Sequence, residues 1–130
     1  MVNMYEDDVL EIFVGTQNRE NYYRSGDDVI VMCVYSAVKN AKQLRISVHK
    51  CINQICRELY ATNKNFVPIN GVNRIVDESV PGMVYLTIPG AGPNTGGRYQ
   101  CKMDYREPRN NHYKSIATEY ENLLLKSRFN

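Results

Sequence analysis

Residues 44–59, LRISVHKCINQICREL, change their hydrophobic period halfway along. The first half alternates apolar and polar side chains, the period of two expected of a half-buried strand; its apolar residues are Leu44, Ile46 and Val48. From Cys51 onward, the apolar residues follow the spacing of one helical face (51, 52, 55, 56 and 59). The pattern predicts a strand, a turn at His49–Lys50 and then a helix ending near Asn63. A single helix over 41–62 is the alternative, because most of these apolar positions also share one helical face.

The rest of the chain predicts a mixed order of strands and helices. Further strands are expected at Val9–Thr16, Asn65–Asp77, Met83–Ile88 and Arg98–Asp104. The Asn70–Gly71 pair also allows a separate small hairpin over Phe66–Asp77. Helices are expected over Asp27–Asn40, capped by Ser25, and from Asn110 or Asn111 to about Leu124.

This order, β-α-β-α-β-β with an appended C-terminal helix, predicts an α/β protein with a two-layer sandwich. A length of 130 residues with 43% hydrophobic residues fits a single domain. The glycine-rich segment Pro89–Gly97 lacks the Lys-Ser/Thr pair of a P-loop, so we interpret it as a flexible connection.

The cysteines and the absence of targeting patterns bear on the compartment. The four cysteines, at 33, 51, 56 and 101, form no CxxC pair and have no zinc-finger spacing. The first nine residues lack the plan of a signal peptide, and the longest apolar runs, of about nine residues, are too short to span a bilayer. We therefore expect buried free thiols, no metal site, no membrane partner, and a cytoplasmic and/or nuclear location.

Charge is divided unequally along the chain. Residues 1–28 carry seven acids and two bases, a net charge of −5, whereas residues 29–130 carry fourteen bases and seven acids, a net charge of +7. A basic body favours an anionic partner, often nucleic acid. A merely solvated basic face is the alternative.

Three short motifs stand at the turns of the predicted order: EIFVGTQ at Glu11–Gln17, followed by Arg19, Asn21 and Tyr22; HKCINQ at His49–Gln54; and VPGMV at Val80–Val84. They resemble the first strand and basic loop, the turn into the second helix, and the entry to the last strand of the Alba superfamily of small chromatin and RNA-binding proteins. The resemblance covers about residues 9–90, leaving 98–130 as an extension. The chain departs from the family pattern at His49, where the family has glycine, and at Gln54, where it has lysine.

The resemblance implies a non-enzymatic nucleic-acid-binding protein without a cofactor, acting as a homodimer or as a heterodimer with a paralogue. Some relatives are subunits of ribonuclease P or MRP ribonucleoproteins, so we expect RNA rather than DNA. A structural subunit that binds mainly another protein is the first alternative. A binder of a small anionic nucleotide in a dimer cleft is the second.

The candidate nucleic-acid-binding residues are cations, aromatic rings or polar groups in the predicted loops and turns or, for Arg45, on the outward side of a predicted strand: Gln17, Arg19, Tyr22, Arg24, Arg45, His49, Lys50, Arg74 and Arg98. Guanidinium groups beside aromatic planes suit RNA bases and phosphates. A cation at the start of a helix suits an anion. Packing of the tyrosines on the body and pairing of the arginines with acids is the structural alternative. We predict no catalytic residue, because Cys51, the thiol nearest to His49, points along an apolar face.

Overall fold

The computed structural model describes residues 8–17, 20–62 and 75–126, and the regular elements among these residues are all strands. The strands are β1 (Val9–Gly15), β2 (Tyr22–Tyr23), β3 (Val29–Ser36), β4 (Lys42–Ile52), β5 (Ile55–Ala61), β6 (Ile75–Asp77), β7 (Met83–Ile88), β8 (Gly97–Arg106), β9 (Tyr113–Ala117) and β10 (Glu121–Leu125). The prediction of an α/β two-layer sandwich is therefore wrong.

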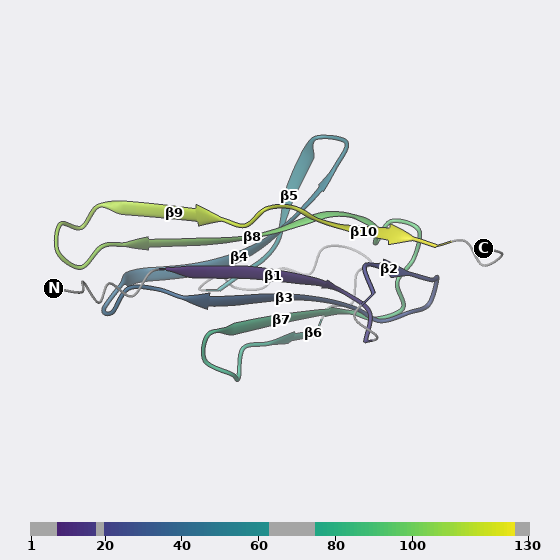
Figure 1. Cartoon of the computed structure of the whole chain (residues 1–130), viewed down its shortest axis with the longest axis horizontal. Coiled ribbons are helices and arrows are strands. Elements are labelled where there is room, and N and C mark those ends of the chain that lie inside the picture. The colour runs from purple at the N-terminus through teal and green to yellow at the C-terminus, as the bar shows by residue number, and fades with distance from the viewer. Residues whose placement is uncertain (1–7, 18–19, 63–74, 127–130) are drawn as a thin grey trace, which may run out of the picture.

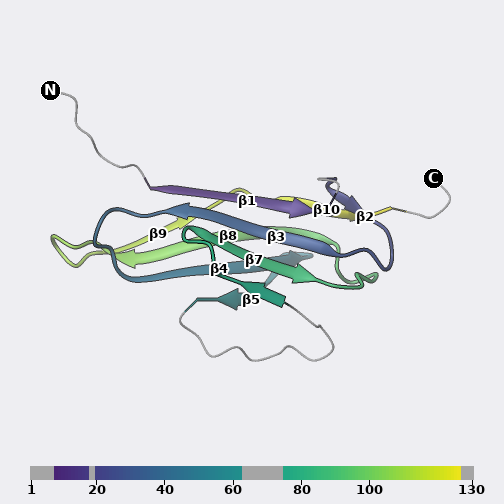
Figure 2. The same cartoon turned by 90° about the horizontal axis from the view of Figure 1, so that it is seen from below.

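The strands form two sheets that lie face to face (Figures 1 and 2). The first sheet has the order β1-β3-β7-β6, and the second has the order β2-β10-β8-β4-β5, with β9 pairing with β8. Neighbouring strands are antiparallel except β2 and β10, which run parallel over two residue pairs. Alternate residues of each sheet point into the space between them and make the core.

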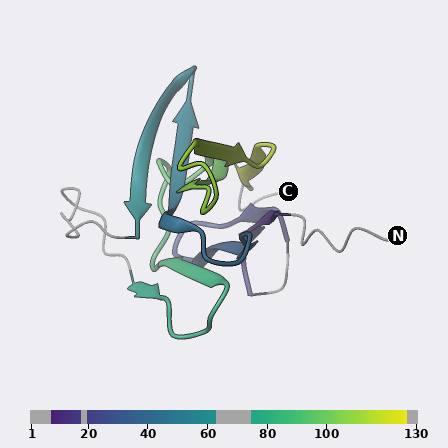
Figure 3. The same cartoon turned by 90° about the vertical axis from the view of Figure 1, so that its left-hand side faces the viewer.

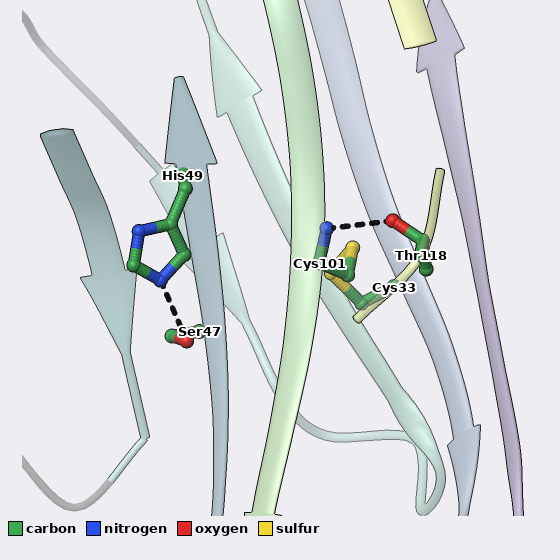
Figure 4. The surroundings of a disulfide bond; sticks show 5 residues. All are labelled: Cys33, Ser47, His49, Cys101 and Thr118. Carbon is green, nitrogen blue, oxygen red and sulfur yellow. Dashed lines mark hydrogen bonds between the residues drawn. A yellow bond between two sulfur atoms is a disulfide. The ribbon is translucent and has the colours of Figure 1, made fainter. Parts of the chain in front are cut away.

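A disulfide joins the two sheets through the middle of this core (Figure 4). Cys33 of β3 bonds to Cys101 of β8, with their Cα atoms 6.0 Å apart. Both residues are fully buried among the aliphatic and aromatic side chains of the facing strands, which include Val31, Val48, Leu86, Met103 and Tyr105. The bond fixes which residues of the two sheets face each other.

Two buried tyrosines hold the segment Pro89–Gly97 against the end of the sandwich. The hydroxyl of Tyr99, two residues before Cys101, donates to the carbonyl of Thr95 at 2.5 Å. The hydroxyl of Tyr23 donates to the carbonyl of Gly92 at 2.6 Å and accepts from the amide of Gly96 at 2.8 Å. We predicted a flexible connection here, but these hydrogen bonds tie the segment to the core.

The first predicted helix, Asp27–Asn40, is wrong, because this stretch contains β3. A helix would bury Ile30 and Val34 on one face, whereas the structure buries Val29, Val31 and Cys33, which alternate. The intervening residues Ile30, Met32 and Val34 are also apolar. A short run that is apolar on both faces carries no clear period, so its sequence does not separate strand from helix.

The second predicted helix, from Cys51, is wrong because the segment is a hairpin. A two-residue turn at Asn53–Gln54, with both φ angles positive at 50° and 69°, pairs Ile52 with Ile55 and Cys51 with Cys56. Apolar residues on opposite arms of so tight a turn also lie three and four positions apart in the sequence (52 to 55, 51 to 55 and 52 to 56). That spacing resembles the repeat of a helical face.

The predicted C-terminal helix is also wrong, because this segment forms two strands. Its apolar residues are divided between β9 and β10, in which Ile116 and Leu123 face the core while Tyr113 and Leu124 are exposed. The strand predictions at Val9–Thr16, Leu44–Val48, Met83–Ile88 and Arg98–Asp104 are confirmed as β1, β4, β7 and β8. Most of the predicted Asn65–Asp77 strand lies outside the described residues, and its end forms β6.

Candidate functional site

The solvent-facing side of the second sheet gathers polar side chains from four strands, and we call it the outer face. Residues of β4 and β8 that pair directly share this side: Arg45 with Asp104, Ser47 with Lys102, and His49 with Gln100. Core residues alternate with them, so the outer side chains are positioned by the same register that builds the core. The outer face consists of Arg45, Ser47, His49, Glu58, Arg98, Gln100, Lys102, Asp104, Arg106, Tyr113 and Ser115.

Hydrogen bonds between strands fix much of the outer face. Arg45 forms an ion pair with Glu58 of β5, and the hydroxyl of Tyr113 donates to Asp104 Oδ1 at 2.6 Å. Gln100 donates its amide to the carbonyl of Thr118 at 2.8 Å. Side chains held in this way lose little conformational entropy when a partner binds.

His49 lies half-buried on the outer face, next to Ser47 (Figure 4). Its Nε2 is 3.0 Å from Ser47 Oγ and 4.0 Å from Glu58 Oε1. Burial lowers the pKa of His49 below its usual value, and the positive charge of Lys102 lowers it further. The Ser47 hydroxyl and the Glu58 carboxylate both lie near Nε2 of His49. In a hydrolase triad the serine and the acid contact different nitrogens of the imidazole, so these three groups do not form one.

The charges of the outer face are predominantly positive. Lys102, Arg45, Arg98 and Arg106 contribute four cations, whereas the acids of the face are Glu58 and Asp104. Such a surface attracts an acidic partner and orients it during approach.

The structure separates the residues that we predicted as nucleic-acid-binding. Arg45, His49 and Arg98 share the outer face, and the guanidinium of Arg98 lies 4.8 Å from the centre of the Tyr120 ring. Lys50 points to the other side of β4, where its ammonium donates to the carbonyl of Asn94 and lies 5.7 Å from the Tyr99 ring.

The remaining predicted residues lie elsewhere. The ring of Tyr22, on β2, has Lys126 at 4.4 Å and Arg24 at 5.8 Å from its centre. Gln17 is an exposed residue after β1. Arg19 and Arg74 fall outside the described residues.

Sequence reasoning missed the partners of Arg45 and His49 on this face. The alternation of Arg98, Gln100, Lys102, Asp104 and Arg106 with buried residues was a visible signal for one polar face of a strand. The sequence does not show that β4 lies beside β8. Without this pairing, the polar residues of β4 and those of β8 could not be assigned to one surface.

All four cysteines form disulfides, so the prediction of free thiols is wrong. The second bond, Cys51–Cys56, closes the β4–β5 hairpin. Disulfides form and persist in oxidising environments and are rare in the cytosol and nucleus. The two bonds therefore overturn the predicted cytoplasmic and/or nuclear location.

Comparisons with known proteins identify the fold. No family model and no curated protein matches the chain. Among solved structures, murine CRIg is similar with a TM-score of 0.70 and 14% identity, covering 93% of this chain and 99% of that one. The fold is immunoglobulin-like. Two structures of a marsupial T cell receptor are similar with TM-scores of 0.65 and 0.64 at 14% and 13% identity, covering 93% and 95% of this chain and 35% and 37% of theirs.

Features of the core agree with this fold. A disulfide between facing sheets and a tyrosine two residues before its second cysteine are hallmarks of immunoglobulin-like sandwiches, and Cys33–Cys101 and Tyr99 fulfil both. The tryptophan that packs on this bond in antibody domains is missing, because the chain contains none. Aliphatic residues of β4, Ile46 and Val48, are buried in the same core.

The resemblance to the Alba superfamily is therefore wrong, and the predicted nucleic-acid binding and RNA or DNA partners are overturned with it. The motif HKCINQ belongs to a β-hairpin and not to the start of a helix. The described part of the chain contains no helix of the length and hydropathy needed to cross a membrane. No cluster of three potential metal ligands occurs in it either.

Proposed function

We propose that this chain is an extracellular recognition domain without catalytic activity, which binds an acidic surface of a partner protein through the outer face. The observation that carries this proposal is the arrangement of Arg45, His49 and Lys102 on the outer side of β4 and β8. Two disulfides suit an extracellular environment. The T cell receptors that share the fold are receptors by name, which supports the same class of function.

Physical properties of the outer face favour recognition over chemistry. The Arg45–Glu58 pair and the Tyr113–Asp104 hydrogen bond hold side chains in place, and Ser47 is buried beneath His49 where a substrate would not reach it. A flat sheet with cations in excess offers electrostatic complementarity to a protein surface rich in Asp and Glu.

A binding experiment on intact cells tests the proposal. The chain is displayed as a fluorescent tetramer, and its binding to a panel of cell lines is measured before and after the cells are treated with protease. We expect protease-sensitive binding to some lines that weakens with added salt. A variant carrying Lys102→Glu and Arg106→Glu should lose about tenfold or more in affinity, because two attractive charges become repulsive.

The matched control is Lys39→Glu, which reverses the charge of an exposed residue between β3 and β4, away from the outer face. This variant should bind like the wild type. Equal binding by the outer-face variant would contradict the proposed site. Binding that survives protease but disappears after removal of cell-surface sulfated glycans would contradict a protein partner.

A further inference from the structure

Two surfaces that the proposed function does not use lie at opposite side edges of the sandwich. The first is the end of the β4–β5 hairpin, residues 50–57, which we call the hairpin tip. The second runs along the unpaired edge of β1 beside the β9–β10 connection, and we call it the edge groove. β1 ends the first sheet over β8 and β10, whereas β5 ends the second sheet beyond β4, so the two surfaces lie on opposite sides of one molecule.

The hairpin tip begins beside β8, where Lys50 pairs with Tyr99, and its end projects away from the sandwich (Figures 1 and 3). Its direction changes at a register shift between Val48 and His49, and its turn is the two-residue Asn53–Gln54 loop. The Cys51–Cys56 disulfide locks the strands next to the turn. A projection fixed in this way is preorganised for docking, which reduces the entropy lost on binding.

The chemistry of the hairpin tip is apolar and basic. Ile52 and Ile55 pair directly at its end and are 47% and 65% exposed. The next pair on the same side of the hairpin is Lys50 with Arg57, because pairs two positions apart share a face. Two large aliphatic side chains are thus presented to solvent beside Arg57, whereas the ammonium of Lys50 donates to the carbonyl of Asn94.

The edge groove has the opposite charge. It is a shallow, open depression of about 320 Å³ lined by Leu10, Glu11, Ile12, Phe13, Thr118, Glu119 and Glu121. Phe13 is 54% exposed, so an apolar ring is available to a partner. Within the described part of the chain, none of the three glutamates forms an ion pair. The groove therefore offers apolar contact together with the negative charges of three glutamates.

The strand that borders the groove is an unprotected sheet edge. Among described residues, β1 pairs only with β3, in a continuous register without a bulge. Its sequence, VLEIFVG, contains no proline and no lysine, the residues that commonly block pairing at an edge. Among the described strands, β5 is likewise the last one of the second sheet.

We propose that the hairpin tip of one molecule docks into the edge groove of a second copy. Ile52 and Ile55 would contact Phe13, and Arg57 would lie near Glu119 and Glu121. The two surfaces differ, so the contact is heterologous and repeats from head to tail instead of closing within a dimer. This self-association is independent of the outer face.

Sedimentation velocity over a range of protein concentrations tests the proposal. The wild type should show a mass that rises with concentration and falls with added salt. Ile55→Asp in the tip, or Glu119→Lys with Glu121→Lys in the groove, should each weaken association by about tenfold or more. All three residues are exposed, and circular dichroism confirms that the variants are folded.

Mixing the tip variant with the groove variant gives the decisive result. The tip variant keeps an intact edge groove, and the groove variant keeps an intact hairpin tip. When mixed, the two variants should therefore form a 1:1 dimer that grows no further, although each variant alone stays monomeric. The outer-face variant Lys102→Glu should associate like the wild type. A wild type that is monomeric up to about 1 mM, variants that associate normally, or a mixture that does not pair would each overturn the proposal.

Discussion

Tyr105 of β8 donates a hydrogen bond from its hydroxyl to Asp8 Oδ2 at 2.7 Å, tying the residue before β1 to the opposite sheet. The same carboxylate accepts from the ammonium of Lys114 at 2.8 Å and from the amide of Val38 at 3.1 Å. Its side chain is only 7% exposed. One charged group thereby connects four separate segments of the chain.

The Asp8 carboxylate should stabilise the fold in a pH-dependent manner. Burial alone would raise the pKa of Asp8, but hydrogen bonds from Lys114 and Tyr105 outweigh it, so the pKa lies below the usual 3.8. A group with a lowered pKa stabilises the folded state above its unfolded pKa, and this stabilisation is lost as the pH falls through its folded pKa. Asp8→Asn should lower the free energy of unfolding by about 1–3 kcal/mol at pH 7 and by less near pH 3. Urea denaturation at the two pH values measures this difference, with exposed Glu119→Gln as the control; an equal loss at both would contradict the ionic role.

The two disulfides should differ in their contribution to stability. The loop-entropy estimate gives about 4 kcal/mol for Cys33–Cys101, which are 68 residues apart, and about 2 kcal/mol for Cys51–Cys56, which are five apart. We expect the Cys33→Ala/Cys101→Ala variant to be less stable than the Cys51→Ala/Cys56→Ala variant in denaturant titrations. The reverse order would show that the inter-sheet bond does not hold the core together.

His49 should make the protein less stable as the pH falls below neutral. Its pKa is lowered in the folded state, first by burial and then by Lys102, so the unfolded chain takes up a proton at a higher pH than the folded chain. Stability therefore decreases as the pH falls from the unfolded pKa of 6.5 towards the folded pKa. In His49→Gln this part of the pH dependence should disappear between pH 7 and pH 5. Thermal unfolding of both proteins across that range measures it, and identical slopes would contradict the expected environment of His49.

The hydroxyl of Tyr23 should be important for holding the segment before β8. Tyr23→Phe removes the acceptor of the Gly96 amide and leaves the Gly92 carbonyl with the Thr95 amide as its donor, which should cost about 1–3 kcal/mol. Tyr120→Phe, at an exposed tyrosine, serves as the control and should change stability by less than about 0.5 kcal/mol. Hydrogen exchange should also accelerate at the Gly96 amide in Tyr23→Phe alone; unchanged exchange would contradict the role of the hydroxyl.

How much of the fold the sequence predicts depends on the element. Short strands such as β1 and β7 could be predicted because their larger apolar residues recur at every second position, and one side of each strand is more buried than the other. The β4–β5 hairpin could not, since its turn residues Asn53 and Gln54 lack the glycine that usually marks a two-residue turn. Its cross-strand apolar pairs then have the spacing of a helix.

The sequence also does not show which distant cysteines and strands pair with one another. Four cysteines permit three full pairings, and the sequence alone does not choose among them. A tyrosine two residues before Cys101, following Thr95-Gly96-Gly97, was the one local signal of this fold. The outer face depends on β4 lying beside β8, so half of its residues were recognisable as polar positions of a strand but not as parts of one surface.

The disulfide between β3 and β8 joins the two sheets and is the covalent feature on which the fold depends. Mass spectrometry of proteolytic peptides from the unreduced protein tests it most directly. Peptides that join Cys33 to Cys101 and Cys51 to Cys56 are the expected result. Four free thiols, or a different pairing, would contradict the two-sheet sandwich and the extracellular location.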